Sequence, residues 1–180
     1  MSKTIKVLLG SVRSQRAGKA VADWVLSKGE ENSVPLELLD LKEWDLPFYD
    51  EPAPPMAGEP YSHDSTKEWS QAVDEADGFI IVTPEYNHGY SPVLKNALDH
   101  LYKEWKDKPV GFVGYGGSGA VNAINQLTPI VEFLGMKPVA EQVGISPVWE
   151  AFDEEGNLQE DKVSGDITNL FKGIQEEIQS

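Results

Sequence analysis

The sequence contains no cysteine, so it forms no disulfide framework and uses no thiol chemistry, which fits a reducing cytoplasm. It also has no run of about 18 apolar residues, the length that a membrane-spanning helix needs. The apolar run within residues 1–10 is too short for a signal peptide. These absences predict a cytoplasmic protein without a membrane segment or a membrane partner.

Basic residues are scarce, because 15 Lys and Arg stand against 30 Asp and Glu and give a formal net charge of −15. Such a surface repels phosphate backbones, so we do not expect nucleic acid as a partner. The acidity is consistent with solubility, with docking to a basic redox partner and with adaptation to high salt, and these alternatives stay open. The length of 180 residues and the hydrophobic content of 40% predict one globular domain spanning 1–180.

Patterns for three common kinds of active site are missing. The three histidines and the acidic residues show no metal-binding spacing, and residues 153–156 lack the glycine position of an EF-hand. Residues 10–20 lack the spacing of a P-loop. Residues 116–120 resemble a hydrolase nucleophile elbow around Ser118, but every histidine precedes that serine, whereas the hydrolase fold places it afterwards. We therefore predict no metal site, no NTPase and no serine hydrolase.

Short apolar runs alternate with amphipathic segments along the chain. The apolar runs predict five buried strands, at 4–9, 35–39, 78–83, 109–113 and 137–145. The amphipathic segments predict helices at 16–28, 65–76, 91–101, from the glycine-rich loop to about 134 with a bend at Pro129, and 163–178. This alternation predicts a parallel sheet covered by helices on both faces. Four prolines within residues 50–61 predict a loop.

Two of these helices begin with recognisable capping signals. Ser65 and Glu68 have the spacing of a capping box. Ser91 precedes Pro92, which is typical of an N-cap serine followed by proline in the first turn. We expect both serines to cap their helices.

Ligands of such open sheets bind beyond the carboxyl ends of the strands, where three loops of this sequence carry distinctive residues. The first, residues 10–17, leads into a helix N-terminus, whose free N–H groups and dipole favour an anion. Arg13 and Arg16 add charge that suits a terminal phosphate. Neutral donors in the same loop are Ser11, Ser14 and Gln15. The alternative is a solvated turn with two surface arginines.

The second loop, residues 84–90, has features that suit a flat polar heterocycle. Tyr86 and Tyr90 offer an aromatic wall, and Asn87 and the backbone offer donors and acceptors. The alternative for both tyrosines is a half-buried packing role. We expect His88 to form local hydrogen bonds and not to act as a catalyst.

The third loop, residues 114–119 (GYGGSG), matches the dinucleotide fingerprint G-x-G-x-x-G. That fingerprint belongs to the turn after the first strand, whereas this loop follows the fourth. Its glycines fit instead a close approach of the backbone to a flat ligand.

Together these loops resemble the NADPH-dependent FMN reductase family, which includes quinone, azo-dye and chromate reductases. The matching stretches are LLGSVRSQRAGKAVADWV from Leu8, TPEYNHGYSPVLKNALDHLYKEW from Thr83 and KPVGFVGYGGSGA from Lys108. We therefore expect an α/β, flavodoxin-like fold, with a doubly wound five-stranded parallel sheet of order 2-1-3-4-5 and helices on both faces.

The resemblance implies FMN as the cofactor and three groups of residues around it. Those that would bind the phosphate are Ser11, Arg13, Gln15 and Arg16. Those that would run along the isoalloxazine, mainly through backbone groups, are Pro84, Glu85, Tyr86 and Asn87. Those that would border the ring from the other side are Gly116, Gly117 and Ser118. The proline-rich segment 50–61 matches no family pattern, and we expect it to shape the substrate pocket.

The implied activity is hydride transfer from NADPH or NADH, through FMN, to a small acceptor such as a quinone, an azo compound or free flavin. We expect ping-pong kinetics and no side chain acting as acid or base. The alternative is a non-enzymatic electron carrier of flavodoxin type, which the acidity favours, whereas Arg13 and Arg16 favour the reductase. A flavin-free receiver domain is disfavoured because residues 8–10 contain no acidic side chain.

The family is typically dimeric or tetrameric, and we expect a homodimer or homotetramer. Tyr102 and Trp105 follow an apolar helical stripe and would be oddly placed on the surface of a monomer. The alternative is that both residues cover the protein's own core.

Overall fold

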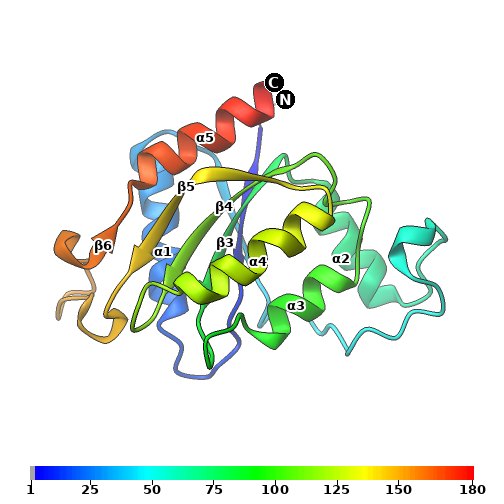
Figure 1. Ribbon diagram of the computed structural model, residues 1–180, viewed down its shortest axis with the longest axis horizontal. Coiled ribbons are helices and arrows are strands. Elements are labelled where there is room, and N and C mark those ends of the chain that lie inside the picture. The colour runs from blue at the N-terminus through cyan, green and yellow to red at the C-terminus, as the bar shows by residue number, and fades with distance from the viewer. Residues whose placement is uncertain (1–2) are drawn as a thin grey trace.

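The computed structural model describes residues 3–180 and contains one six-stranded sheet of order β2-β1-β3-β4-β5-β6 (Figure 1). Met1 and Ser2, which begin the run considered above for a signal peptide, lie outside the described residues. The strands are β1 (Ile5–Leu9), β2 (Leu36–Asp40), β3 (Gly78–Pro84), β4 (Pro109–Tyr115), β5 (Lys137–Ile145) and β6 (Val163–Ser164). The first five are parallel, and β6 pairs antiparallel with β5.

The order of the first five strands confirms the predicted flavodoxin-like α/β class. The sixth strand was not predicted, because residues 163–164 were assigned to the last helix. That helix, α5 (Ile167–Gln179), begins later since Gly165 adopts a φ of +80° and Asp166 caps it by accepting from the N–H groups of Thr168 and Asn169.

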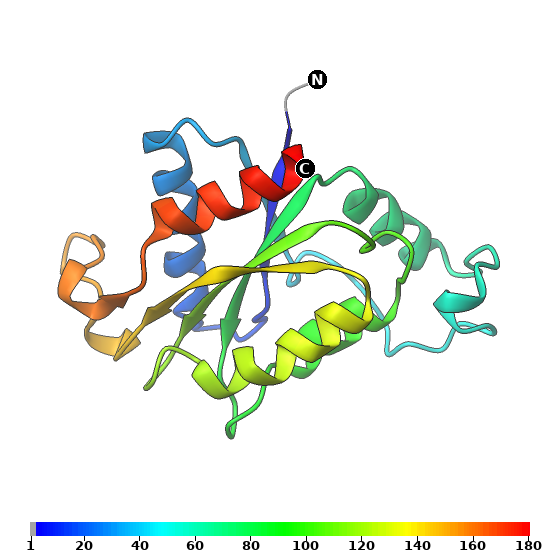
Figure 2. The same ribbon diagram turned by 45° about the horizontal axis from the view of Figure 1, so that its top comes forward.

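Helices cover both faces of the sheet (Figure 2). One face carries α1 (Gly18–Glu31) and α5, and the other carries α2 (Asp64–Asp74), α3 (Pro92–Asp99) and α4 (Val121–Phe133). Burial on both sides explains why β1, β3 and β4 are buried at every position and read as continuous apolar runs. Short 3₁₀ turns lie at Pro55–Ala57, Val148–Glu150 and Glu160–Lys162. No helix within residues 3–180 is long and apolar enough to cross a membrane.

Three aromatic side chains fill the core between the sheet and helices α2 to α4. Trp105 lies edge-on to Trp69 and to Phe79, with ring centroids 6.3 and 5.1 Å apart. Its indole N–H donates to the carbonyl of Leu98 at 3.2 Å, and the side chain is fully buried. The prediction that Trp105 would be oddly exposed on a monomer is therefore wrong. Tyr102 is only half-buried.

The two capping predictions had different outcomes. Ser91 caps α3, because its hydroxyl accepts from the N–H of Leu94 at 3.3 Å. The predicted capping box is wrong, since α2 begins at Asp64 and Ser65 lies inside the helix. The Glu51 carboxylate accepts from the N–H groups of Ser62 and His63 and so fixes the chain just before this earlier start.

Candidate functional site

The three distinctive loops follow β1, β3 and β4, which are neighbours in the sheet, so they lie side by side at one edge (Figure 1). Hydrogen bonds join the first loop to the end of β3 and to the start of α3. The N–H of Gly10 donates to the carbonyl of Val82 at 2.9 Å, and the hydroxyl of Ser91 donates to the carbonyl of Gly10. The predicted site residues are therefore brought to one end of the molecule.

In the first loop, Arg13 and Arg16 lie in different surroundings. Arg13 is exposed and makes no side-chain hydrogen bond or ion pair to any of residues 3–180. Arg16 instead pairs with Asp40 at the end of β2: Nη1 donates to Oδ1 at 2.7 Å, and Nη2 contacts Oδ2. Nη1 also donates to the carbonyl of Ser11. The side chains of Arg16 and Asp40 are only 9% and 4% exposed, so this ion pair holds the loop from inside.

The N-terminus of α1 is open at the same place. Its N-cap residue, Ala17, supplies no side-chain acceptor, and the first turn contains no acidic residue. Gln15 and Ser14 are exposed, whereas Ser11 is buried with its hydroxyl 3.0 Å from that of Tyr86. Free N–H groups beside an exposed arginine favour an anion such as a phosphate ester.

A buried hydroxyl that was absent from the predicted site lies against this helix end. Tyr115, the last residue of β4, is 5% exposed, and its hydroxyl has no hydrogen-bond partner among residues 3–180. A Cβ atom on Gly18 would lie 2.2 Å from that hydroxyl, so Tyr115 reaches the first residue of α1. The Tyr115 side chain is therefore packed against the start of α1.

The second loop forms a tight turn at Tyr86–Gly89. The N–H of Tyr86 donates to the carbonyl of Gly89 at 2.8 Å, and the reverse bond is 2.9 Å. Asn87 and His88 have φ angles of 51° and 62°, as a type I′ turn requires. The turn leaves the N–H groups of Asn87 and His88 free at its exposed tip. Tyr90 packs against the core, which agrees with the half-buried packing role given above as the alternative.

The Glu85 carboxylate joins the second loop to the start of α4. It accepts from the N–H groups of Asn122 and Ala123 at 2.9 and 3.3 Å and from the Asn122 side chain at 3.1 Å. Burial alone would raise the pKa of Glu85, but these hydrogen bonds outweigh it and hold the pKa below its ordinary value. Because the side chain caps α4, the backbone of this loop is what remains to face a ligand. Pro84 is buried at the end of β3.

Two residues of α4 fix the tip of the turn and were missed by the sequence analysis. Gln126 donates to the carbonyl of His88 at 2.6 Å, and the Asn122 amide lies 2.9 Å from Nδ1 of His88. These contacts agree with the local hydrogen-bonding role expected for His88. No sequence pattern could reveal them, because both residues lie in an ordinary helix more than one element away.

The third loop combines close packing with open space. A Cβ atom on Gly114 would meet the carbonyl of Gly119 at 2.1 Å, so this glycine is required by the loop's own fold. Gly116 has a φ of +149° and faces open space. Gly117 and Ser118 are exposed, and the ring of Trp149 lies 3.5 Å from the position of a Cβ on Gly117.

A cavity of about 250 Å³ opens beside the first loop. Val12 of that loop and Val93 of α3 line it together with Trp44 and Leu46 from the segment that precedes the proline-rich loop. Its walls are mainly apolar, which suits the body of a small aromatic compound. Among residues 3–180, no group of histidine and acidic side chains is placed to hold a metal ion.

Comparison with known proteins decides the family. The family model described as NADPH-dependent FMN reductase matches residues 4–150. The chain belongs to this family. The resemblance inferred from the three loops is therefore confirmed, and with it the enzyme class of NAD(P)H-dependent FMN reductase.

Individual relatives agree. An NAD(P)H-dependent FMN reductase of Schizosaccharomyces pombe is 45% identical over 135 residues, which are 74% of this chain and 68% of that protein. An NADPH azoreductase of Bacillus sp. strain OY1-2 is 31% identical over 160 residues, 86% of this chain and 82% of that protein. The solved structure of the NAD(P)H:acceptor oxidoreductase FerB from Paracoccus denitrificans has a TM-score of 0.71 and 24% identity, covering 98% of this chain and 96% of that one, which shows a shared fold.

The family confirms FMN as the cofactor and NAD(P)H as the reductant expected from the sequence. The described residues fit that cofactor, because the open N-terminus of α1 and the unpaired Arg13 are both suited to a phosphate group. Which side chains contact FMN stays a prediction.

Proposed function

We propose that this protein transfers hydride from NADPH or NADH to small electron acceptors, with FMN held beyond the carboxyl ends of β1, β3 and β4. The observation that carries the proposal is the open N-terminus of α1 beside Arg13, at the same sheet edge as the turn Tyr86–Gly89 and the glycine-rich loop. When bound, FMN supplies the chemistry that accepts and donates hydride.

In this proposal the phosphate is bound by Ser11, Arg13 and Gln15, together with the N–H groups of α1. The resemblance also assigned Arg16 to the phosphate. We propose that Arg16 acts mainly by holding the loop, because both of its Nη groups are engaged by Asp40 and the Ser11 carbonyl.

The ring is held mainly by backbone groups of the other two loops. Pro84 to Asn87 run along one side, where the free N–H groups of the turn can donate to a polar edge that gains negative charge. Gly116, Gly117 and Ser118 border the other side, where the two glycines lack Cβ atoms and so allow close approach. Positioning is the task of these residues, and no side chain is required as acid or base.

We further infer that the acceptor range is broad. An azoreductase among the relatives supports azo compounds as acceptors, and the mainly apolar cavity beside Val12 supports quinones and free flavins as well. Lys42 is the single charged residue that lines this cavity, and one cation at a mainly apolar wall does not restrict it to one kind of acceptor. Reductant and acceptor approach the same opening between the loops and exclude each other, so ping-pong kinetics are expected.

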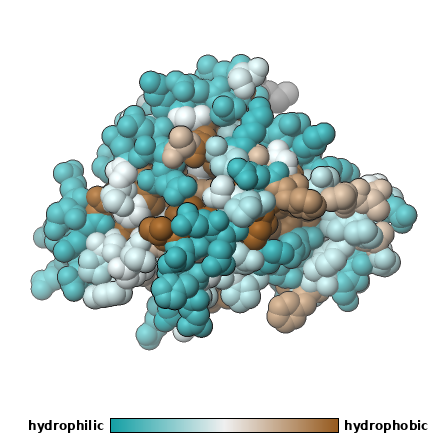
Figure 3. Space-filling view, in the orientation of Figure 1, coloured by the Kyte–Doolittle hydropathy of each residue, from teal (hydrophilic) through white to brown (hydrophobic). Residues whose placement is uncertain are grey.

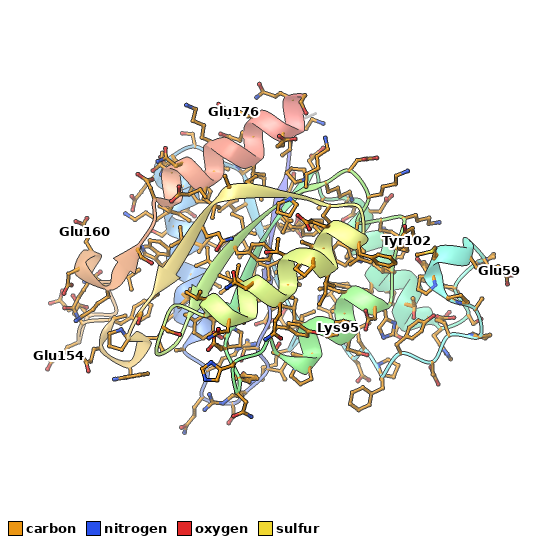
Figure 4. All side chains as sticks on the ribbon, viewed as in Figure 1. Glu59, Lys95, Tyr102, Glu154, Glu160 and Glu176 are labelled. Atoms are coloured by element: carbon orange, nitrogen blue, oxygen red, sulfur yellow. The ribbon has the colours of Figure 1, made fainter. Side chains whose placement is uncertain are left out.

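We also propose a homodimer or homotetramer formed by copies of this chain. Val121 and Phe133, at opposite ends of α4, are 54% and 67% exposed. Phe133 packs edge-on against Tyr102, with ring centroids 6.5 Å apart. Figure 4 shows Tyr102 near the C-terminal end of α4. Apolar residues gather around the C-terminal end of α4 on an otherwise mostly hydrophilic face (Figure 3). Light scattering should give a mass above the 19.9 kDa of one chain, and Phe133→Ser should lower it. A wild-type mass of one chain at micromolar concentration contradicts the assembly.

Reduction of the bound flavin tests the function directly. The FMN-loaded protein should be yellow, and NADPH should bleach it in stopped-flow measurements without any acceptor. Initial rates with NADPH and a benzoquinone varied together should give parallel double-reciprocal lines, whereas intersecting lines contradict mutual exclusion.

The electron-carrier alternative has one observation in its favour, the net charge of −15, which suits docking to a basic partner. If neither NADPH nor NADH reduces the bound flavin while a separate reductase does, the carrier replaces the proposed enzyme.

A further inference from the structure

Trp149 is a large apolar side chain that lies in solvent. It is 72% exposed, whereas Trp69 and Trp105 are fully buried and Trp24 and Trp44 pack partly buried against the core. Tryptophan is highly buried on average, because its ring system removes much apolar surface from water. Single exposed apolar residues are nevertheless common on protein surfaces, so the position of this one decides whether it has a function.

The turn that carries this residue, Val148–Glu150, is hydrogen-bonded to the glycine-rich loop. The N–H of Val148 donates to the carbonyl of Gly116 at 3.1 Å. The Ser146 hydroxyl, just before the turn, donates to the carbonyl of Gly117 at 2.8 Å. The exposed ring is therefore presented by a fixed turn, which is held by the loop proposed to border the ring of FMN.

Contacts at both edges of the Trp149 ring fix its orientation. Atoms Cη2 and Cζ3 lie 3.5 and 3.8 Å from the position of a Cβ on Gly117, so the benzo edge faces the glycine-rich loop. At the opposite edge, Nε1 donates to Oε1 of Glu150 at 3.2 Å. An exposure of 72% leaves the surface of this held ring open to stack against a second flat ring.

The place of Trp149 indicates which part of a substrate can reach it. A ring that exchanges hydride has to lie on the flavin, whereas Trp149 follows β5, one strand beyond the three strands that carry the loops of the site. A second ring on the same substrate, away from the reacting one, suits this place. In the proposed function both reductants, NADPH and NADH, carry such a ring, the adenine. Bases stack on aromatic side chains without further requirements because every base has a π-face.

The charges beside Trp149 favour an uncharged ring. Nζ of Lys162 lies 3.9 Å from Oε2 of Glu150 and 3.5 Å from Oδ2 of Asp161, so one cation is shared between two carboxylates. Adenine is neutral and is not repelled there. The 2′-phosphate that distinguishes NADPH from NADH meets no free cation in this group. Stacking on Trp149 should therefore serve both reductants alike.

We propose that Trp149 binds the adenine of NADPH or NADH by stacking, at the opening beside the glycine-rich loop. The inference rests on the proposed function, since it takes NAD(P)H as the reductant and this edge of the sheet as the flavin site. It assigns a substrate-binding residue to the segment after β5, which lies outside the three loops that the sequence marked.

The experiment separates the adenine from the reacting ring. Reduced nicotinamide mononucleotide, NMNH, has the nicotinamide but lacks the adenosine half of NADH, and ADP-ribose has the adenosine half but lacks the nicotinamide. FMN-loaded wild type, Trp149→Ala and Phe48→Ala are reduced with NADPH, NADH or NMNH in stopped flow without acceptor, and calorimetry measures their binding of ADP-ribose. Phe48 is the matched control, because it is an aromatic residue 86% exposed that does not adjoin the glycine-rich loop in sequence.

Trp149→Ala should lower the second-order rate constant of reduction by NADPH and by NADH at least about fivefold, the smallest loss expected for one base stacked on an aromatic side chain. The rate constant with NMNH should stay within about twofold, and the affinity for ADP-ribose should fall at least about fivefold. Trp149→Phe retains an aromatic ring and should lose less than Trp149→Ala. Phe48→Ala should match wild type in each measurement.

Several results would overturn the inference. Unchanged reduction of Trp149→Ala by NADPH and NADH, or equal rate constants of wild type with NADH and NMNH, would show that the adenine gains nothing from this ring. An equal fall with NMNH, or a loss of affinity for FMN, would show that Trp149 supports the flavin site itself. A lower mass of Trp149→Ala in light scattering would show a contact between copies of the chain.

The acceptor is tested in the same variants. If Trp149→Ala is reduced normally but reacts more slowly with an azo compound, the ring contacts the acceptor and the inference about adenine is wrong. In all of these cases wild type is still reduced by NADPH or NADH, so only this inference fails. If neither compound reduces wild type, the proposed function fails with it.

Discussion

Helices α1 and α4 both begin at the carboxyl edge of the sheet, and both have an alanine as N-cap residue, Ala17 and Ala120, that supplies no side-chain acceptor. Neither has an acidic residue in its first turn. At α4, Glu85 from the loop after β3 accepts from two of the N–H groups. At α1 no carboxylate of the described residues takes that place. The two helices therefore begin with similar sequences, but the N-terminus of α1 is open to an anion, whereas that of α4 is already capped by a carboxylate.

The difference lies in how each nearby carboxylate is used. Asp40 lies at the end of β2, next to the first loop, but it is occupied by Arg16. Glu85 is held away from any ligand by α4 itself. Asp40 thus stabilises the first loop through Arg16 and leaves the N-terminus of α1 open. Glu85 instead caps the N-terminus of α4 and leaves the backbone of the second loop open. The predictions below separate these two arrangements.

The largest expected effect is on the buried ion pair. Asp40→Ala leaves Arg16 buried and unpaired, and should lower the free energy of unfolding by about 3–5 kcal/mol in urea titration. Asp23→Ala is the matched control, because Asp23 pairs with Lys19 at the surface and should change it by less than about 1 kcal/mol. Combining Asp40→Leu with Arg16→Met should recover most of the loss, and equal effects of the two single alanine variants contradict the buried role.

Arg13 should affect the binding of the FMN phosphate and leave the free energy of unfolding unchanged. Arg13→Ala should weaken FMN binding by about 1.5–3 kcal/mol, the size of a charge-assisted hydrogen bond, and leave riboflavin binding unchanged. Fluorescence titration of both flavins measures this. Lys19→Ala removes another cation near the same helix end and serves as the control. Equal affinity of wild type for FMN and riboflavin would show that the open end of α1 does not bind the phosphate.

Glu85→Gln tests the closed helix end. It should lower the free energy of unfolding at neutral pH by about 1 kcal/mol, since a carboxylate at the N-terminus of α4 is lost. FMN and riboflavin binding should weaken together, in contrast to Arg13→Ala, because the ring-side loop is loosened.

The pH dependence of that variant has a defined sign. The pKa of Glu85 in the folded protein lies below its ordinary value of 4.5, so its contribution to stability is present above about pH 4.5 and is lost as the pH falls through the lowered pKa. Urea titrations at several pH values should show the difference between wild type and Glu85→Gln shrinking in this acid range. A difference that is constant down to low pH would show that the charge is not responsible.

The smallest effect is expected at the tip of the turn. His88→Gly gives the Asn-Gly pair that type I′ turns prefer, and should raise the free energy of unfolding by up to about 1 kcal/mol. Ser33→Gly, at a φ of 56° far from the site, should give a similar gain without touching the loops. A loss for His88→Gly alone would show that its contact with Asn122 outweighs the backbone strain.

Local patterns determined much of the fold in advance. Alternation of apolar runs and amphipathic segments predicted five parallel strands, the family resemblance supplied their order, and the loops at their ends marked the candidate site. The strand β6 escaped prediction because two residues are too few to show a pattern. Trp105 was misplaced because an apolar stripe reveals one face of a helix but not what covers its end, which here is the side chains of Trp69 and Phe79.

The parts of the site that sequence reasoning missed depend on contacts between distant segments. Asp40 and Asn122 carry no motif, and each acts on a loop that belongs to another strand. Tyr115 lies within the GYGGSG stretch, but no pattern predicts that its side chain reaches Gly18 of α1. Arg16 fitted the phosphate pattern as well as Arg13 did. Only the position of β2 beside β1 reveals that a carboxylate lies within reach of it.

The contact between Gly18 and Tyr115 also constrains how this protein can change over generations. Any side chain at position 18 collides with the phenol, so a lineage must first exchange Tyr115 for a smaller residue before position 18 is free to vary. The reverse order passes through a variant in which either the phenol of Tyr115 or the first helix is displaced. Residues 18 and 115 should therefore covary among relatives, with bulky side chains at one position accompanied by small ones at the other.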